Sequence, residues 1–329
     1  LASVIASPPD LAEFVISPAA LHGLEVRRGA PPTLSPPVAS RNDDAPPESG
    51  PGASVLELTE PGDLAALRWI ARDRRSPAAG EVEIEAVAAG LNFRDVMWSL
   101  GLLPEEALED GFAGPTVGFE CAGRIVAVGD GVTDFAPGDH VIAMAPACFA
   151  SHVTVTCDAV ARLPDNVALD DAATIPVAFL TAHYALDHLA NLRKDEWVLI
   201  HGAAGGVGLA AIQVARRLGA RIIATAGSEE KRSLLHALGA EHVLDTRSLE
   251  FVDEVKRLTG GGVDVALNSL AGEAMERSIE LMRPFGRFLE LGKRDFYANT
   301  KIGLRPLRRN VSYFGIDADQ LLTYRPDVV

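Results

Sequence analysis

A glycine-rich turn between an apolar run and an amphipathic run constrains this chain most. The run 197–200 (WVLI) leads into the turn 201–208 (HGAAGGVG), and apolar residues recur at helical spacing over 209–218. This order predicts a strand, a tight turn and a helix whose first N–H groups can bind a pyrophosphate. The alternative is a turn with a structural role only. If a dinucleotide binds here, the expected contacts are Gly202, Ala203, Ala204, Gly205, Gly206, Val207 and Gly208.

The region 191–318 alternates between short apolar runs and amphipathic runs. Strands are expected over 197–202, 221–226, 242–245, 263–268, 287–291 and 312–316, and helices over 206–218, 229–238, 249–258 and 273–282. This alternation predicts an α/β fold with a doubly wound parallel sheet of the Rossmann type. We therefore expect 191–318 to be the dinucleotide-binding domain.

The region 53–190 has a different pattern, with short runs that alternate with period two. Strands are expected over 55–58, 67–70, 81–87, 116–128, 140–145 and 150–156, with a helix over 93–102. This predicts a compact, mostly antiparallel β-domain that supplies the substrate side of the site. Residues 1–52 are rich in Pro, Ser, Asp and Gly, which predicts a linker or the end of a preceding domain.

Charge and cysteine content limit which partners and which cellular compartment fit this chain. The 329 residues carry a net charge of -15, which argues against nucleic acid and anionic membranes as partners. The three cysteines lack paired spacing, as expected for reduced thiols in a cytoplasmic protein. No apolar run is long enough for a membrane span.

Three further sequence blocks indicate the family of this chain. They are 92–96 (NFRDV), 268–273 (NSLAGE) and 289–295 (LELGKRD). Together with the glycine turn, they resemble the enoylreductase domain of a modular polyketide synthase or animal-type fatty acid synthase. That domain belongs to the medium-chain dehydrogenase/reductase superfamily. The resemblance runs from about residue 53 to the end of the chain. It implies a GroES-like β-domain beside the Rossmann domain, with 319–329 as the start of a truncated C-terminal return segment.

The end of the second Rossmann strand bears on the choice of cofactor. An NAD site usually has an acidic residue there, whereas this chain has Ala226, Gly227 and Ser228. In the resembling family, a Ser, a Lys and an Arg hold the 2′-phosphate of NADPH, which here implies Ser228, Lys231 and Arg247. Glu229 and Glu230 leave open a 2′-hydroxyl contact instead, and the two cations could be surface charges. We expect NADPH.

The metal-ligand places of zinc-dependent relatives hold Asn92 and Phe119 here, and the sequence has no cluster of four spaced cysteines. We therefore expect no metal. His201, beside the glycine turn, is expected to be a packing residue.

The resemblance assigns further site residues. Asn92 is expected near the nicotinamide. The alternative for Asp95 is a carboxylate that only stabilises a helix N-terminus. The substrate side is assigned to Phe93, Asp95 and Leu103, and further cofactor contacts to Thr181, Asn268, Leu270 and Gly292. In polyketide enoylreductases, a Tyr at the place of Leu103 goes with one configuration of an α-methyl group. Its absence here implies a 2R product, unless Leu103 is only an apolar wall.

The implied activity is reduction of the 2,3-double bond of a 2-enoyl thioester by NADPH. The thioester is expected on an acyl carrier protein, beside neighbouring domains of the same synthase. Lys293 and Asp317 are the expected proton donor and its partner, and a stiffening ion pair is the alternative. Two rival functions remain: a free-standing quinone or alkenal reductase, and a non-catalytic NADPH-binding module.

Overall fold

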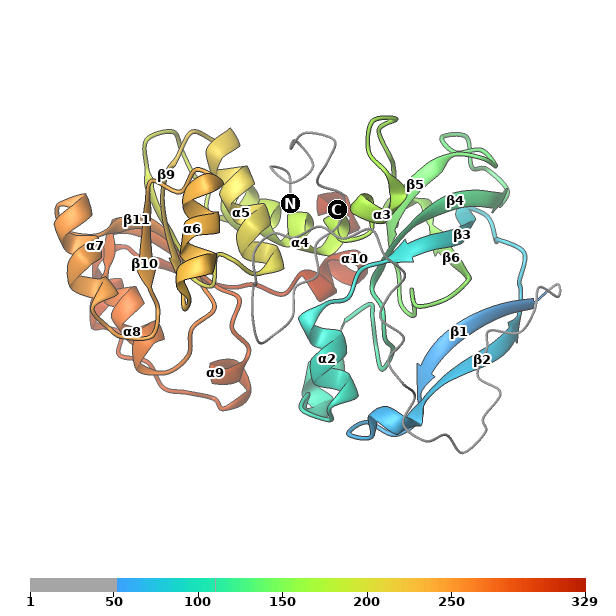
Figure 1. Ribbon diagram of the computed structural model, residues 1–329, viewed down its shortest axis with the longest axis horizontal. Coiled ribbons are helices and arrows are strands. Elements are labelled where there is room, and N and C mark those ends of the chain that lie inside the picture. The colour runs from blue at the N-terminus through green and yellow to red at the C-terminus, as the bar shows by residue number, and fades with distance from the viewer. Residues whose placement is uncertain (1–51, 110) are drawn as a thin grey trace. The chain divides into compact units, whose positions relative to one another are not determined.

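The computed structural model describes residues 52–109 and 111–329 (Figure 1). These residues form two compact units. One unit comprises Thr181–Ile316. The other comprises residues 52–180 of the described chain together with Asp317–Val329. The expected domain boundary at 190/191 thus lies ten residues beyond the division of the units, which falls within helix α4 (Ile175–His183). The expected linker at 1–52 lies almost wholly outside the described residues.

The first unit contains a six-stranded parallel sheet. Its strand order is β10-β9-β8-β11-β12-β13, which is the doubly wound order of a Rossmann domain and confirms the predicted fold class. The strands are β8 (Trp197–Ile200), β9 (Arg221–Ala226), β10 (His242–Asp245), β11 (Val263–Asn268), β12 (Met282–Glu290) and β13 (Ser312–Gly315). The connecting helices are α5 (Gly206–Arg217), α6 (Glu229–Ala237), α7 (Phe251–Thr259) and α8 (Glu273–Glu280), followed by the short α9 (Arg294–Tyr297).

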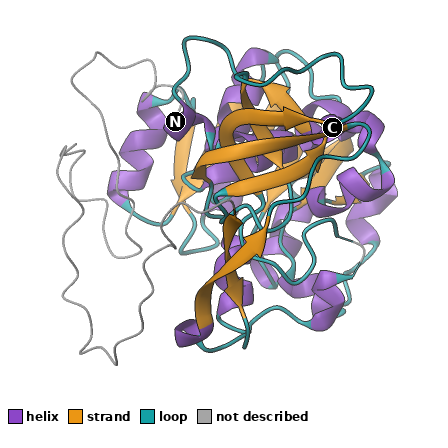
Figure 2. Ribbon diagram, turned by 90° about the vertical axis from the view of Figure 1, so that its right-hand side faces the viewer, coloured by secondary structure: helices purple, strands orange, loops and turns teal. Residues whose placement is uncertain are grey.

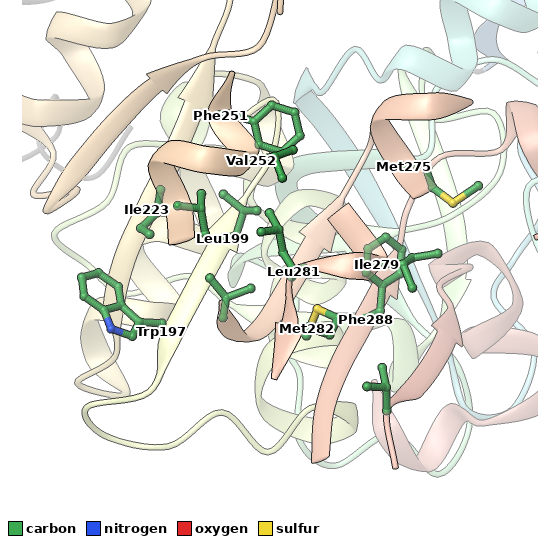
Figure 3. Packing of buried hydrophobic residues seen from close by; sticks show 14 residues of the cluster. Trp197, Leu199, Ile223, Phe251, Val252, Met275, Ile279, Leu281, Met282 and Phe288 are labelled. Atoms are coloured by element: carbon green, nitrogen blue, oxygen red, sulfur yellow. The ribbon is translucent and has the colours of Figure 1, made fainter. Parts of the chain in front are cut away.

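The core of this unit forms where the apolar strands meet the apolar faces of α7 and α8. Every residue of β8 is buried, as expected for a central strand covered on both faces. Figure 3 shows Trp197 and Leu199 from β8 in one cluster with Phe251 from α7 and Phe288 from β12. This packing fixes the carboxyl ends of the strands, where ligands of open α/β sheets bind.

The second unit contains a five-stranded antiparallel sheet in the order β6-β3-β4-β5-β7 and a separate hairpin of β1 and β2 (Figure 2). These strands are β1 (Gly52–Leu58), β2 (Leu67–Asp73), β3 (Glu81–Ala89), β4 (Glu120–Val128), β5 (His140–Met144), β6 (His152–Thr156) and β7 (Val160–Arg162). Its helices are α2 (Phe93–Ser99), α3 (Leu169–Ala172), the first part of α4, and α10 (Leu321–Tyr324). The mostly antiparallel β-domain is confirmed.

The C-terminal segment is held in this second unit by Asp319. The carboxylate of Asp319 accepts a hydrogen bond from the N–H of Ala113 at 3.1 Å and lies 3.5 Å from the guanidinium of Arg94. The carbonyl of Asp319 accepts from the N–H of Phe112. Arg94, one residue before the buried Asp95 in α2, thus links that helix to the segment Asp317–Val329.

Three expected boundaries are wrong, each because of a local backbone feature. Helix α2 ends at Ser99 and not at 102, because Gly101 has φ +65°, and the N–H groups of Gly101 and Leu102 bond back to the carbonyls of Trp98 and Met97. Strand β4 begins at Glu120 and not at 116, because Gly118 is left-handed. Strand β12 begins at Met282 and not at 287, because the strand continues through a bulge around Phe285, which has φ +65°.

Candidate active site

The glycine turn joins β8 to α5 as predicted. Gly202 has φ +58°, a conformation that favours glycine. A Cβ atom on Gly208 would lie 2.5 Å from the Cα atom of Ala203, so this glycine lets the helix pack closely against the turn. A Cβ atom on Gly206 would meet nothing within 4 Å. The protein's own packing therefore does not require glycine at 206, whereas a ligand phosphate approaching the first turn of α5 would.

His201 is the first residue of this turn and fixes its position. Its ring is buried, with Nδ1 3.0 Å from Thr225 Oγ1 and Nε2 2.9 Å from Ser278 Oγ. The ring also contacts Phe251 edge to face at 5.0 Å between centroids. Burial lowers the pKa of His201 to about 3, so the imidazole is neutral. The expected packing role of His201 is confirmed, and its two hydrogen bonds tie β8, β9 and α8 together at the start of the turn.

The expected 2′-phosphate residues lie where β9 and β10 end. Ser228 caps α6 and accepts a hydrogen bond from the N–H of Lys231 at 3.4 Å. The guanidinium of Arg247 donates to the carboxylate of Asp245 from Nη2 at 2.8 Å. This contact raises the pKa of Arg247 and lowers that of Asp245. Side-chain atoms of Arg247 lie within 4 Å of a Cβ placed on Gly227, next to Ser228.

Arg232 was missed by the sequence reasoning. Its largely buried side chain donates to the carbonyl of Ala226 at 3.2 Å, lies 3.0 Å from Asp245, and donates to Glu229 at 2.7 Å. Asp245 therefore lies between two guanidinium groups, and Glu229 is engaged by one of them. The sequence signal was a second basic residue in the first turns of α6, next to Lys231.

Two buried polar residues organise the loops after β11 and β12. Asn268 Nδ2 donates to Glu290 Oε2 at 2.6 Å and to the carbonyl of Leu270 at 2.7 Å. The other carboxylate oxygen of Glu290 accepts from the N–H of Gly292 at 2.6 Å. Burial raises the pKa of Glu290 to about 7 despite these donors. The expected cofactor residues Asn268, Leu270 and Gly292 thus share one network, through a glutamate that sequence reasoning did not select.

Lys293 follows this network directly. Its Nζ atom donates to the carbonyl of Ile316 at 2.7 Å and lies 5.9 Å from the ring centre of Phe296. Asp317, the residue after Ile316, belongs to the second unit and accepts a hydrogen bond from the N–H of Asp319 at 3.2 Å. Thr181, the remaining expected cofactor residue of the first unit, is buried at the start of that unit.

In the second unit, Asn92 and Asp95 lie at the N-terminus of α2. Asp95 is only 2% exposed, and its two carboxylate oxygens accept from the N–H groups of Asn92 at 2.7 Å and Gly118 at 2.6 Å. Burial raises the pKa of Asp95 against these bonds. Asp95 therefore joins α2 to the loop before β4. Phe93, by contrast, is 78% exposed, and Leu103 is half-buried beyond the end of α2.

Asn92 and Phe119, at the positions that hold metal ligands in zinc-dependent relatives, make other contacts in this chain. Asn92 Nδ2 donates to Glu120 at 2.8 Å, and the ring of Phe119 packs against Phe112 and beneath the guanidinium of Arg94. Within residues 52–109 and 111–329, no three His, Cys, Asp or Glu side chains are grouped so that they could hold a metal ion. None of the helices in the same ranges is both long and apolar enough to cross a membrane.

Comparisons with known proteins agree with this architecture. Residues 78–180 match the alcohol dehydrogenase GroES-like domain, and residues 206–324 match the zinc-binding dehydrogenase family. Over 272 residues, 82% of this chain, the sequence is 46% identical to a phenolphthiocerol/phthiocerol polyketide synthase of Mycobacterium tuberculosis. The chain spans about 12% of the length of that relative.

Two solved structures are similar over most of their length. CurK enoyl reductase has 41% sequence identity and a TM-score of 0.76, with 84% of each chain covered. The mycobacterial protein Rv1454c, solved in complex with NADPH, has 30% identity and a TM-score of 0.68, with 80% of this chain and 81% of that chain covered.

The two-unit fold, the glycine turn and these matches define a medium-chain dehydrogenase/reductase, an oxidoreductase with a nucleotide-binding Rossmann domain. Within that class, this chain belongs to the enoyl reductases of polyketide synthases.

Proposed function

We propose that this chain reduces the 2,3-double bond of a 2-enoyl thioester carried by an acyl carrier protein, with NADPH as the reductant. The observation that carries the proposal is the 41% identity to CurK enoyl reductase across 84% of both chains. The acyl carrier protein and neighbouring synthase domains are the proposed partners, and the cytoplasm is the proposed location. The similarity to a mycobacterial polyketide synthase supports these assignments.

The residues of the first unit fit a dinucleotide. The open space at Gly206 and the first N–H groups of α5 would receive the pyrophosphate. Ser228, Lys231 and Arg247 would receive the 2′-phosphate, and no acidic residue ends β9 to bond a 2′-hydroxyl. When bound, NADPH supplies a hydride to the β-carbon of the enoyl group. Neutral His201 supports the turn without adding charge.

Lys293 is the proposed proton donor to the α-carbon. Hydride addition to the β-carbon leaves an enolate, and one proton at the α-carbon completes the reduction. An ammonium carries three N–H bonds, so Lys293 can keep its bond to the carbonyl of Ile316 while it gives up a proton. Asp317, next to Ile316 in the chain, would favour the protonated lysine.

The proposal is tested by comparing substrates for the 329-residue chain. A crotonyl thioester of pantetheine should be reduced with NADPH, faster than with NADH at equal concentrations. A quinone and a free alkenal should be reduced more slowly than the thioester. Quinone reduction without thioester reduction would favour a free-standing quinone reductase, and NADPH binding without any reduction would favour a non-catalytic module.

A further inference from the structure

Glu120 is a buried acid that the proposed mechanism does not use. It begins β4 and is only 2% exposed. In the described part of the chain no ion pair includes it, and no cation is among the groups that perturb its pKa. Burial raises that pKa to about 7 against the two hydrogen bonds that its carboxylate accepts. A buried carboxylate without a cation is costly, which calls for a role beyond filling space.

The two hydrogen bonds of Glu120 are directional. Oε1 accepts from Asn92 Nδ2 at 2.8 Å, and Oε2 accepts from the N–H of Val177 at 2.8 Å. The atom of Asn92 that faces Glu120 is therefore the amide nitrogen, which can only donate. A side chain on Gly90 would collide with the carboxylate of Glu120, and the absence of one leaves room for this contact. Glu120 therefore holds the amide nitrogen of the Asn92 carboxamide toward the interior.

The backbone of Asn92 is fixed independently of Glu120. The carboxylate of Asp95 holds the N–H of Asn92 at 2.7 Å and is itself held by Gly118. The side chain of Asn92 also forms a capping box with the backbone of Asp95, so Glu120 and the start of α2 together set the orientation of its carboxamide. Asn92 is partly exposed, and its amide nitrogen carries a second hydrogen that the bond to Glu120 does not use.

We propose that Glu120 is a positioning residue that orients the carboxamide of Asn92 toward the nicotinamide end of NADPH. This inference rests on the proposed function, because it assumes that Asn92 contacts that end of the cofactor. The group it would recognise is a hydrogen-bonding oxygen of the nicotinamide carboxamide or of its ribose.

The substitution Glu120→Gln separates orientation from packing. Its side chain keeps the shape of the glutamate, and its carbonyl oxygen can still accept from Val177. Its amide nitrogen then faces Asn92 Nδ2, and two donors cannot bond to each other. The carboxamide of Asn92 must turn over, which exchanges the donor and the acceptor that it presents. Because a buried charge is removed, the thermal midpoint should stay close to that of the wild type.

The test compares two ligands by their dissociation constants. NADPH contains the nicotinamide end, and 2′-phospho-ADP-ribose lacks the nicotinamide ring. Glu120→Gln should weaken NADPH about five- to tenfold, the scale of one lost hydrogen bond, and leave 2′-phospho-ADP-ribose unchanged. Asn92→Ala should cause a similar loss, and the double variant should lose little more than either single one. Glu83→Gln is the matched control, since Glu83 is also buried but pairs with Arg74, and it should bind both ligands as the wild type does.

The outcomes separate this inference from the proposed function. An equal loss for both ligands, additive losses in the double variant, or unchanged NADPH binding in Glu120→Gln would overturn the role of Glu120 alone. A wild-type chain that binds 2′-phospho-ADP-ribose no more weakly than NADPH would also overturn it. A wild-type chain that binds neither ligand would overturn the proposed function, and the inference with it.

Discussion

Lys293 Nζ donates a hydrogen bond to the carbonyl oxygen of Ile316 across 2.7 Å. The two residues follow neighbouring parallel strands, β12 and β13, at the carboxyl edge of the sheet. The turn that leads to Lys293 is fixed by Glu290, whose carboxylate binds the N–H of Gly292. The lysine is therefore held at both its backbone and its side chain. A group that delivers a proton to one position must be fixed in this way.

Lys293→Met should reduce turnover of the enoyl thioester about 10²- to 10⁴-fold, the usual scale for loss of a general acid. NADPH affinity should change little, because the proposed role concerns the substrate carbon. Stopped-flow kinetics with fluorescence titration of NADPH measures both quantities. Lys301→Met, at an exposed lysine, is the control. Near-native turnover in Lys293→Met would identify water as the donor, and a collapse of NADPH affinity would make Lys293 a cofactor residue.

Arg247→Ala should weaken NADPH by about tenfold or more and NADH very little, because only NADPH carries the 2′-phosphate. The change also removes the partner that lowers the pKa of Asp245, although Arg232 remains beside that carboxylate. Calorimetric titration with both cofactors measures the difference. Arg257→Ala, which breaks an exposed pair with Glu254, is the control and should affect neither cofactor. Equal losses for NADPH and NADH would show that Arg247 has a structural role.

A 2-methyl-enoyl thioester should give the 2R product. In polyketide enoylreductases, a tyrosine at the position of Leu103 goes with the 2S product, and Leu103 has no phenol. Chiral chromatography of the released acid measures the ratio of the two products. Leu103→Tyr is the informative variant, and it should shift the ratio toward 2S. A wild-type product that is mainly 2S contradicts the assignment of Leu103 to the substrate side.

The buried imidazole of His201 should make stability fall in acid. Its pKa is lowered to about 3 in the folded chain, against about 6.5 in the unfolded chain. The unfolded state therefore binds the proton first, so the contribution of neutral His201 is complete above pH 6.5 and is lost as pH falls toward 3.

Urea unfolding between pH 7.5 and pH 5 measures this loss, at up to about 1.4 kcal/mol for each pH unit below 6.5. The stability advantage of the wild type over His201→Gln should shrink across that range, while its difference from His236→Gln, at an exposed histidine, should stay nearly constant. A constant difference from His201→Gln would mean that His201 does not titrate in this way.

Local sequence patterns predicted the Rossmann unit closely. Strands β9, β10 and β11 begin and end at the predicted residues, because each is an apolar run bounded by turn residues. The second unit was less predictable at its edges. The glycine closure after α2 depends on a left-handed residue, and so does the bulge at Phe285 in β12 of the first unit; a pattern of apolar residues does not reveal either one.

The site was predicted less completely than the fold. The glycine turn, Asn92 and Lys293 were selected because they lie in recognisable motifs. Glu120 and Glu290 were not selected, although Glu290 lies in the block 289–295, because their contacts are with asparagines that are 28 and 22 residues away in the chain. Two residues so far apart give no local signal of the contact.

The proposed reduction is tested most directly by following the transferred hydrogens. NADPH deuterated at C4 of the nicotinamide should place one deuterium at the β-carbon of the saturated thioester, whereas reaction in deuterated water should place one at the α-carbon. Mass spectrometry and NMR of the product locate both labels. Saturated product with this labelling is the predicted result, and consumption of NADPH without any labelled saturated thioester would contradict the assignment of this chain as an enoyl-thioester reductase.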